Sequence, residues 1–264
     1  MRLTVLGSSA SQPAAGDASS GYLVSAGEQG ARTHVLLDCG SGVLGNLLQH
    51  VALPELRAIF VSHMHPDHYI DLIAMRYGLR YGEHGARPVD VYLPPGGMRQ
   101  LQAVSEAISK TQPFFTGALD LHEYVPGVAV PVGGLSVTPQ AVVHGIPSHG
   151  MRVTDGQATL AYSSDTVMCP ELEVLAKDAD VLLAENTLGG GAPDHHYPRT
   201  HLSAAEAGVV AGLGGVGTLV LTHFWHTADR ARAQQEAAAT FTGRVIVGRP
   251  HLQVEVGAPA AVSP

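Results

Sequence analysis

Short apolar runs alternate with amphipathic segments along most of the chain. Runs rich in β-branched and other apolar residues predict strands, at residues 2–6, 19–24, 34–37, 58–61, 89–93, 180–185, 218–224 and 244–247, and a strand pair at 135–143. Apolar residues at helical spacing predict helices, at residues 43–50, 70–81, 98–110, 171–179 and 228–241. A further helix is predicted to start at Ser203, where Glu206 completes a capping-box pattern. Because strands and helices alternate in both halves, the pattern predicts an α/β protein with helices packed on its sheets.

Two segments between these elements lack a clear period. Residues 114–126 predict an irregular segment. Aromatic residues make up only 5% of the chain, so we expect Phe114, Phe115 and Tyr124 to pack in the core rather than line a substrate entrance. Residues 186–200 are rich in glycine and predict a mobile loop at the entrance of a site.

The composition is that of a globular protein, with 45% apolar and 14% charged residues. A length of 264 residues suits one large or two small domains. The formal net charge of −8 disfavours a protein that grips long nucleic acid through its phosphates. It does not exclude nucleic acid, because bound divalent cations would make a site locally positive.

Features that place a protein in the cell point to the cytoplasm. The two cysteines, Cys39 and Cys169, do not make a disulfide framework, and reduced thiols fit that compartment. Residues 1–7 form a short strand pattern without the apolar core and cleavage site of a signal peptide. No apolar run reaches membrane-spanning length. We therefore expect a cytoplasmic protein with no membrane partner.

Histidines are concentrated in a loop between a predicted strand and a predicted helix, in the stretch His63-Met64-His65-Pro66-Asp67-His68. His63 and His65 lie two positions apart, so an extended segment would place both imidazoles on one side. Asp67 and His68 follow a turn and can face a neighbouring position. Imidazole and carboxylate ligands together suit zinc, iron or manganese better than calcium or magnesium. The loop therefore predicts a transition-metal site.

This loop and the motifs around it resemble the metallo-β-lactamase superfamily. The shared motifs are Asp38-Cys39-Gly40-Ser41-Gly42, the histidine loop, His144 with Gly150 and Arg152, Tyr162-Ser163-Ser164-Asp165-Thr166, and His223 at a strand end. Within that superfamily the chain is most similar to the ribonuclease Z-like phosphodiesterase branch. It looks closest to a compact group there, proposed to be atypical cyclic-nucleotide phosphodiesterases. The resemblance implies a four-layer αββα sandwich in one domain, residues 1–257, with a frayed tail at 258–264.

The resemblance also implies two adjacent metal ions that share a bridging carboxylate. The implied ligands are His63, His65 and His144 for one ion, Asp67, His68 and His223 for the other, and Asp165 as the bridge. Most of these ligands are imidazoles, so two zinc ions are expected, with manganese or iron as alternatives. The family motif has glycine where this chain has Ser164, which costs backbone freedom but need not disturb the bridge.

Residues around the metal ions receive roles from the same resemblance. Asp38 would accept hydrogen bonds that hold the metal loop in shape, because metal ligands need a fixed orientation. Glu185 would orient a catalytic histidine. His201, which lies before a helix N-terminus, would contact the scissile phosphate. Asp67 could take a proton, and His201 could stabilise or protonate the leaving oxygen. Residues 7–13 form either a loop beside the metal site, as in the family, or an ordinary hairpin turn.

These features predict a binuclear-metal phosphodiesterase for a small substrate, foremost a 3′,5′-cyclic nucleotide. The stretch between His144 and Asp165 has room only for a hairpin at residues 154–157, where transfer-RNA-processing ribonuclease Z enzymes commonly carry a long arm. A ribonuclease Z-like RNA or DNA nuclease, a lactone or thioester hydrolase, and an inactive metal-dependent binding module are the alternatives. Family members often dimerise, so a homodimer is also open. The sequence assigns no role to His149, His195, His196 or His226.

Overall fold

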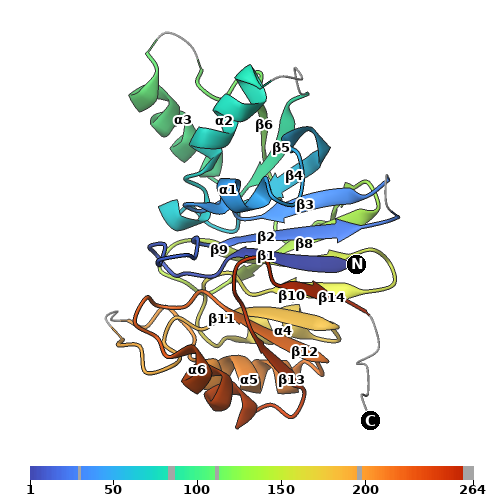
Figure 1. Cartoon of the computed structure of the whole chain (residues 1–264), viewed down its shortest axis with the longest axis vertical. Helices are drawn as coiled ribbons and strands as arrows, with labels where there is room; N and C mark the ends of the chain where they lie inside the picture. Colours follow the sequence, from blue (N-terminus) through green and yellow to red (C-terminus); the bar gives the residue numbers. More distant parts are fainter. Residues whose placement is uncertain (29–30, 83–86, 111–112, 195–197, 258–264) are drawn as a thin grey trace.

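The computed structural model describes residues 1–28, 31–82, 87–110, 113–194 and 198–257. The tail predicted at residues 258–264 lies outside these residues. Within the described part, the chain forms two seven-stranded sheets between two groups of helices (Figure 1). No helix among the described residues is long and apolar enough to cross a membrane.

The first sheet combines the N-terminal half of the chain with one C-terminal strand. In spatial order its strands are β14 (Gln253–Glu255), β1 (Arg2–Gly7), β2 (Gly21–Ala26), β3 (Thr33–Leu37), β4 (Leu56–Phe60), β5 (Val89–Leu93) and β6 (Leu119–Glu123). The strands from β14 to β3 pair antiparallel, and those from β3 to β6 pair parallel. The helices of this half are α1 (Val43–Leu47), α2 (Leu72–Tyr81) and α3 (Gly97–Ile108), with short 3₁₀ turns at Leu53–Glu55 and Pro66–His68.

The second sheet comes from the C-terminal half. In spatial order its strands are β13 (Arg244–Val247), β12 (Thr218–Thr222), β11 (Val181–Glu185), β10 (Thr159–Tyr162), β9 (Ser148–Thr154), β8 (Leu135–Val142) and β7 (Val130–Val132). The strands from β7 to β10 pair antiparallel, and those from β10 to β13 pair parallel. The helices α4 (Pro170–Ala176), α5 (Ala204–Leu213) and α6 (Arg230–Ala238) connect the parallel strands.

Three apolar clusters separate the layers. Successive side chains of a strand point to opposite faces, so each central strand feeds two clusters. In β4, Ile59 packs with the helices α1 to α3, while Phe60 faces the other sheet. In β11, Leu182 packs with α4 to α6, while Leu183 faces the first sheet. These clusters confirm the predicted four-layer αββα sandwich.

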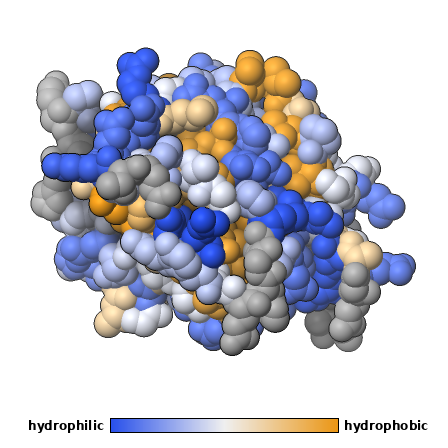
Figure 2. Space-filling view, turned by 90° about the horizontal axis from the view of Figure 1, so that it is seen from above, coloured by the Kyte–Doolittle hydropathy of each residue, from blue (hydrophilic) through white to orange (hydrophobic). Residues whose placement is uncertain are grey.

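The end of the molecule that carries α2 and α3 has a mixed surface. Figure 2 shows hydrophobic residues scattered among hydrophilic ones on this face. Met98 and Ile108 of α3 are among the exposed apolar side chains. Single exposed apolar residues are usual on a soluble surface and need no special function.

The two sheets meet along the edge that holds the histidine loop. The carboxyl ends of β4, β8, β10 and β12 all lie there, because β8 and β10 each pair antiparallel with β9 and so run the same way. A bridge between Ser9 and Phe224 joins the loop after β1 to the loop after β12. Ligands of open parallel sheets bind outside the carboxyl ends of the strands, so this edge is where a site is expected.

The structure contains strands that the sequence pattern did not predict, among them β6, β7, β9 and β14, and it replaces one predicted strand pair by a single strand. Residues 114–126 are not all irregular, because they contain β6. This strand lies at the edge of the sheet, and its outward-facing Asp120 and His122 hide its apolar alternation. The predicted core packing of Phe114, Phe115 and Tyr124 is confirmed, since all are buried.

The predicted strand pair at 135–143 is instead the single strand β8. Pro139 interrupts its apolar run without ending it. The neighbouring β7 reaches only the level of Val137, so Pro139 lies beyond the part of β8 that pairs on that side. A proline lacks the N–H that a central strand position needs, and it is tolerated where one side has no strand partner.

Candidate metal centre

The predicted metal ligands converge at the shared edge of the two sheets. The potential ligand atoms of His63, His65, His144 and Asp165 all lie within 4.8 Å of one another. The same holds for Asp67, His68 and His223, and for a third group made of Asp165, His201 and His223. The first two groups have the membership that the sequence predicted, and Asp165 lies between them.

Two buried atoms at the centre have no hydrogen-bond partner among the described residues. They are Nε2 of His68 and Oδ1 of Asp165, and they lie 3.5 Å apart. The other carboxylate oxygen, Asp165 Oδ2, lies 3.7 Å from Nε2 of His63 and 3.4 Å from Nε2 of His223. Buried polar atoms without partners are costly, and divalent cations would satisfy them. The donors therefore fit metal ions, with Asp165 between the two groups of candidate ligands.

Asp38 fixes two of the histidines through a buried hydrogen-bond network. Its Oδ2 accepts bonds from Nδ1 of His68 (2.8 Å), the Tyr162 hydroxyl (2.7 Å) and the Ser62 hydroxyl (2.8 Å). Because the Ser62 hydrogen is used on Asp38, Nδ1 of His63 must donate to Ser62 Oγ at 3.1 Å. Nδ1 of both imidazoles is thus occupied in this network, and Nε2 of each ring is the atom that would bind a cation.

The ligands from the second sheet are held in the same way. Nδ1 of His144 donates to the carbonyl oxygen of Thr200 at 2.9 Å. Nδ1 of His223 donates to Oγ1 of Thr187 at 2.8 Å, and the Thr187 hydroxyl donates to Glu185 at 2.7 Å. These partners again leave Nε2 of each ring for a cation.

His65 differs from the other histidines, because it presents Nδ1 and not Nε2 to the neighbouring candidate ligands. Its Nδ1 lies 3.0 Å from Nε2 of His63 and 3.3 Å from Nε2 of His144. Burial lowers the pKa of His65, and the neighbouring His144 lowers it further. Burial and the neighbouring His68 likewise hold the pKa of His63 well below its usual range. Neutral imidazoles whose lone pairs converge are the form that binds a metal ion.

The carboxylates of the centre are ionised. Burial alone would raise the pKa of Asp165, but His223 and His68 beside it hold that pKa well below its usual range. Burial would also raise the pKa of Asp67, and His68 and His223 outweigh it. Oδ2 of Asp67 accepts the backbone N–H of Ser11 at 2.9 Å. The loop at residues 7–13 therefore lies beside the candidate centre and is not an ordinary hairpin turn.

His201 is held by Glu185, which the resemblance predicted to orient a catalytic histidine. Its Nδ1 lies 2.9 Å from Glu185 Oε1, which also accepts the N–H of Thr166. Burial lowers the pKa of His201, but the Glu185 carboxylate outweighs burial and raises the pKa to about 9. Nδ1 of His201 is thus bound to Glu185, and the residue lines the cavity at the centre.

A cavity of about 490 Å³ opens onto the centre. It is lined by Ser11, His65, Pro66, Asp67, His144, Gly145, Ile146, Asp165, Thr200 and His201. Candidate ligands from both sheets and His201 thus face one space. Its volume is within the range of small-ligand pockets.

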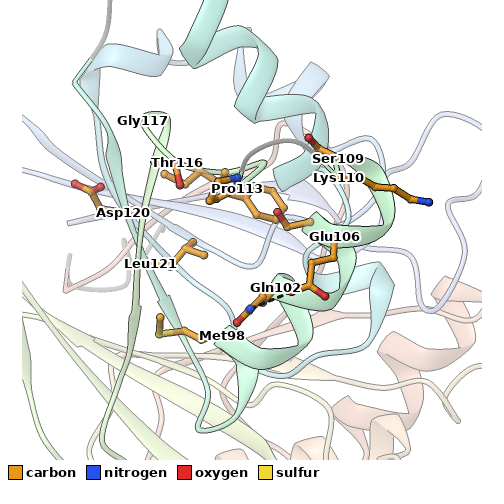
Figure 3. Close-up of a pocket in the computed structure, with 13 residues that line it drawn as sticks. Met98, Gln102, Glu106, Ser109, Lys110, Pro113, Thr116, Gly117, Asp120 and Leu121 are labelled. Atoms are coloured by element: carbon orange, nitrogen blue, oxygen red, sulfur yellow. Dashed lines mark hydrogen bonds between the residues drawn. The ribbon is translucent and has the colours of Figure 1, made fainter.

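A second cavity, of about 570 Å³, lies between α3 and β6 at a distance from the candidate ligands (Figure 3). Met98, Gln102 and Glu106 of α3 line one side, and Leu121 of β6 lines the other. The amide of Gln102 donates to Glu106 at 3.0 Å. None of the predicted site residues lines this cavity, so it has no part in the metal centre.

Of the histidines without a predicted role, His149 and His226 do not join the centre. His149 is buried in β9, where its ring packs against Tyr124 and its backbone N–H donates to Ser62. It therefore does not flank the entrance. His226 is exposed after β12. His195 and His196 fall on residues 195–197, outside the described part of the chain.

The predicted mobile loop at residues 186–200 is tied down over its first, described part. Gly190 donates its N–H to Glu236 of α6, and its carbonyl accepts the N–H of Asp229. The N–H of Leu188 donates to Leu202. A lid role for this part has no support from these contacts.

Sequence reasoning did not identify two residues of this site, Thr187 and Thr200. Thr187 lies two positions after Glu185, so the alternation of the strand could have placed both on one face. Thr200 acts through its backbone carbonyl, and a side-chain pattern contains no signal for that.

Comparison with known proteins agrees with this site. Residues 33–224 match the model of a beta-lactamase superfamily domain, and this span includes every candidate ligand. The chain is 36% identical over 249 residues to the uncharacterized protein Rv1339 of Mycobacterium tuberculosis, covering 93% of this chain and 88% of that protein. It is 28% identical over 280 residues to a ribonuclease Z of Mycobacterium bovis, covering 97% of this chain and 98% of that protein.

A third relative has a solved structure. The probable metallo-hydrolase YhfI of Bacillus subtilis is 29% identical over 252 residues, covering 94% of this chain and 97% of YhfI. Its crystal structure superposes with a TM-score of 0.84 at 26% identity, covering 96% of this chain and 99% of that chain. The similarity extends over both sheets and both helical layers.

Proposed function

This chain belongs to the beta-lactamase superfamily, and from that premise we propose that it is a metal-dependent hydrolase of phosphodiesters. The proposed metal is a pair of zinc ions, with manganese or iron as alternatives. The proposed substrate is a small phosphodiester, foremost a 3′,5′-cyclic nucleotide.

One observation carries the proposal. The buried atoms Nε2 of His68 and Oδ1 of Asp165 lack partners among the described residues and lie between two clusters of candidate ligands. An apolar packing role for this edge would not leave such atoms without hydrogen bonds. Two cations would satisfy both atoms and would stand beside a cavity that His201 lines.

When bound, divalent ions here would polarise a phosphodiester and make a nucleophile available at neutral pH. The residues of the chain would orient the substrate and transfer protons. Asp67, fixed by the N–H of Ser11, would accept a proton from the nucleophile. His201, fixed by Glu185, would place Nε2 against the phosphate or the leaving oxygen.

Three features support a small substrate. Between β9 and β10 the chain makes a tight turn in which Asp155 accepts the N–H groups of Gln157 and Ala158. This turn leaves no room for an arm that would hold a folded RNA. The cavity of about 490 Å³ is large enough for a mononucleotide, and a net charge of −8 disfavours binding of a long polyanion.

A nuclease is the second candidate, and one observation favours it. The relative named ribonuclease Z matches 97% of this chain at 28% identity. The same metal ligands and His201 would serve an RNA phosphodiester as well as a cyclic one. The two candidates therefore differ in what binds outside the cavity, not in the chemistry.

A substrate panel on the zinc-loaded protein tests the proposal. We expect 3′,5′-cyclic AMP or cyclic GMP to be hydrolysed with a larger kcat/KM than a precursor transfer RNA. Faster cleavage of the RNA would favour the nuclease. A lactone or thioester cut faster than all phosphodiesters would overturn the phosphodiesterase.

Two variants test the assigned roles. His201→Ala is expected to lower kcat by about 10²–10⁴-fold while bound zinc is retained. Asp67→Asn is expected to lower both activity and zinc content, because Asp67 is also a candidate ligand. His122→Ala is the control, since His122 is exposed and pairs with Asp90 at 2.9 Å. If the protein is an inactive binding module, it shows no turnover even without a substitution.

A further inference from the structure

Ser164 differs from the glycine of the family motif, yet it keeps a backbone conformation that favours glycine. Its φ is +55°, in the left-handed region. The side chain is fully buried directly before the bridging candidate Asp165. A serine held in a strained conformation next to a candidate ligand indicates that its hydroxyl has a role.

The hydroxyl of Ser164 joins a chain of buried hydrogen bonds. Ser164 Oγ lies 2.9 Å from Oγ of Ser148, the first residue of β9. Ser148 Oγ donates to the carbonyl oxygen of Asp165 at 2.9 Å. On its other side, Ser164 Oγ lies 3.4 Å from Nδ1 of His63. Both serines are at most 1% exposed, so water does not compete for these bonds.

The donors and acceptors of this chain have one consistent assignment. The Ser148 hydrogen is used on Asp165, so Ser148 Oγ must accept the hydrogen of Ser164. Ser164 Oγ then has only lone pairs to offer to His63. The N–H at Nδ1 of His63 therefore faces two hydroxyl acceptors, Ser62 at 3.1 Å and Ser164 at 3.4 Å. This arrangement keeps Nε2 of His63 unprotonated.

We propose that Ser148 and Ser164 form a positioning pair for the metal centre. They fix the tautomer of His63 and the backbone of Asp165, and so connect the loops after β4, β8 and β10. The inference rests on the metal centre proposed above. It adds residues that act through the ligands and touch neither metal nor substrate.

The test uses the metal-free full-length protein and measures zinc affinity by competition with a chromophoric chelator. We expect Ser164→Ala and Ser148→Ala each to weaken zinc binding at the His63 site about tenfold. Because the two hydroxyls act in series, the double variant should lose about as much zinc affinity as the single variant with the larger loss. Nitrogen chemical shifts of the imidazoles should show a larger share of the other His63 tautomer in Ser164→Ala.

Two further variants separate positioning from folding. Ser164→Gly removes the hydroxyl but relieves the left-handed backbone, so zinc affinity should fall while the metal-free protein melts no lower. Ser105→Ala removes a buried hydroxyl that accepts the N–H of Phe114 at 2.7 Å, remote from the metal cluster. It should lower the melting temperature and leave zinc affinity unchanged.

The outcomes distinguish this inference from the proposed function. If wild-type protein binds two zinc ions and the Ser148 and Ser164 variants bind them within twofold of wild type, the positioning pair is wrong and the metal centre stands. If Ser105→Ala weakens zinc as much as they do, the effect is general destabilisation and the inference fails. If wild-type protein takes up no zinc, manganese or iron, the metal centre itself is wrong.

Discussion

At the scale of single residues, backbone strain is concentrated around the candidate centre. Asp38, Ser164 and His223 have φ values of 59°, 55° and 55° although none is glycine. Such conformations cost on the order of 1 kcal/mol each and persist where surrounding contacts enforce them. The residue types at these positions could be read from motifs, but the strain could not, because it arises from contacts between loops that are distant in sequence.

The Asp38 network makes a testable contribution to stability. Tyr162→Phe removes a buried hydroxyl that donates to Oδ2 of Asp38 at 2.7 Å. We expect the free energy of unfolding in urea to fall by about 1.5–3 kcal/mol, because the lost bond goes to a charged acceptor. Tyr77→Phe is the matched control, since Tyr77 is 48% exposed. Equal losses in the two variants would show that the bond to Asp38 contributes nothing specific.

Gly40 is required by the close approach of the histidine loop. A Cβ atom at this position would lie 1.8 Å from the backbone oxygen of Asp67. Gly40→Ala should therefore displace Asp67, lower stability by about 1–3 kcal/mol and reduce zinc content. Gly45→Ala in α1 meets nothing within 4 Å and should stabilise the protein by up to about 1 kcal/mol. Normal zinc content in Gly40→Ala would show that this close approach does not hold the histidine loop in place.

At the scale of elements, periodicity identified most of the central strands and helices but missed the internal strand β9 and the edge strands β6, β7 and β14. Buried strands such as β4 and β11 have apolar residues on both faces and are evident in the sequence. The edge strand β6 and the three-residue strand β14 are held by pairing with β5 and β1, so their own residues contain little signal. The metal ligands and Asp38 were identifiable from motifs shared with a known family, whereas Thr187 and the carbonyl of Thr200, which orient His223 and His144, were not.

The N-terminus of α5 is an element whose local signal was correct. Ser203 accepts the N–H of Glu206, and the Glu206 carboxylate accepts the N–H of Ser203, as the capping box predicted. Ser203→Ala should lower the free energy of unfolding by about 1 kcal/mol, measured by thermal or urea melts. Ser203→Asp retains a capping oxygen and should recover most of that loss. A loss that the aspartate does not recover would mean that packing, not capping, stabilises this end.

At the scale of the whole molecule, the candidate centre connects the two halves of the sandwich. His63, His65, Asp67 and His68 follow a strand of the first sheet, whereas His144, Asp165 and His223 follow strands of the second. A cation bound by ligands from both sheets binds the folded chain far better than the unfolded one. The fold and the site are therefore linked, and metal binding should be visible in the stability of the entire protein.

Metal removal tests this linkage. With free zinc a hundredfold above its Kd, the free energy of unfolding should exceed that of the chelator-treated protein. The increase should be about 2.7 kcal/mol for each site that binds zinc in the folded chain and not in the unfolded chain. His223→Ala should lose part of this increment, because it removes a ligand supplied by the second sheet. His122→Ala should keep all of it, since His122 pairs with Asp90 inside the first sheet. A melting temperature that zinc and chelator leave unchanged would mean that the convergent side chains at this edge do not bind a metal that joins the sheets.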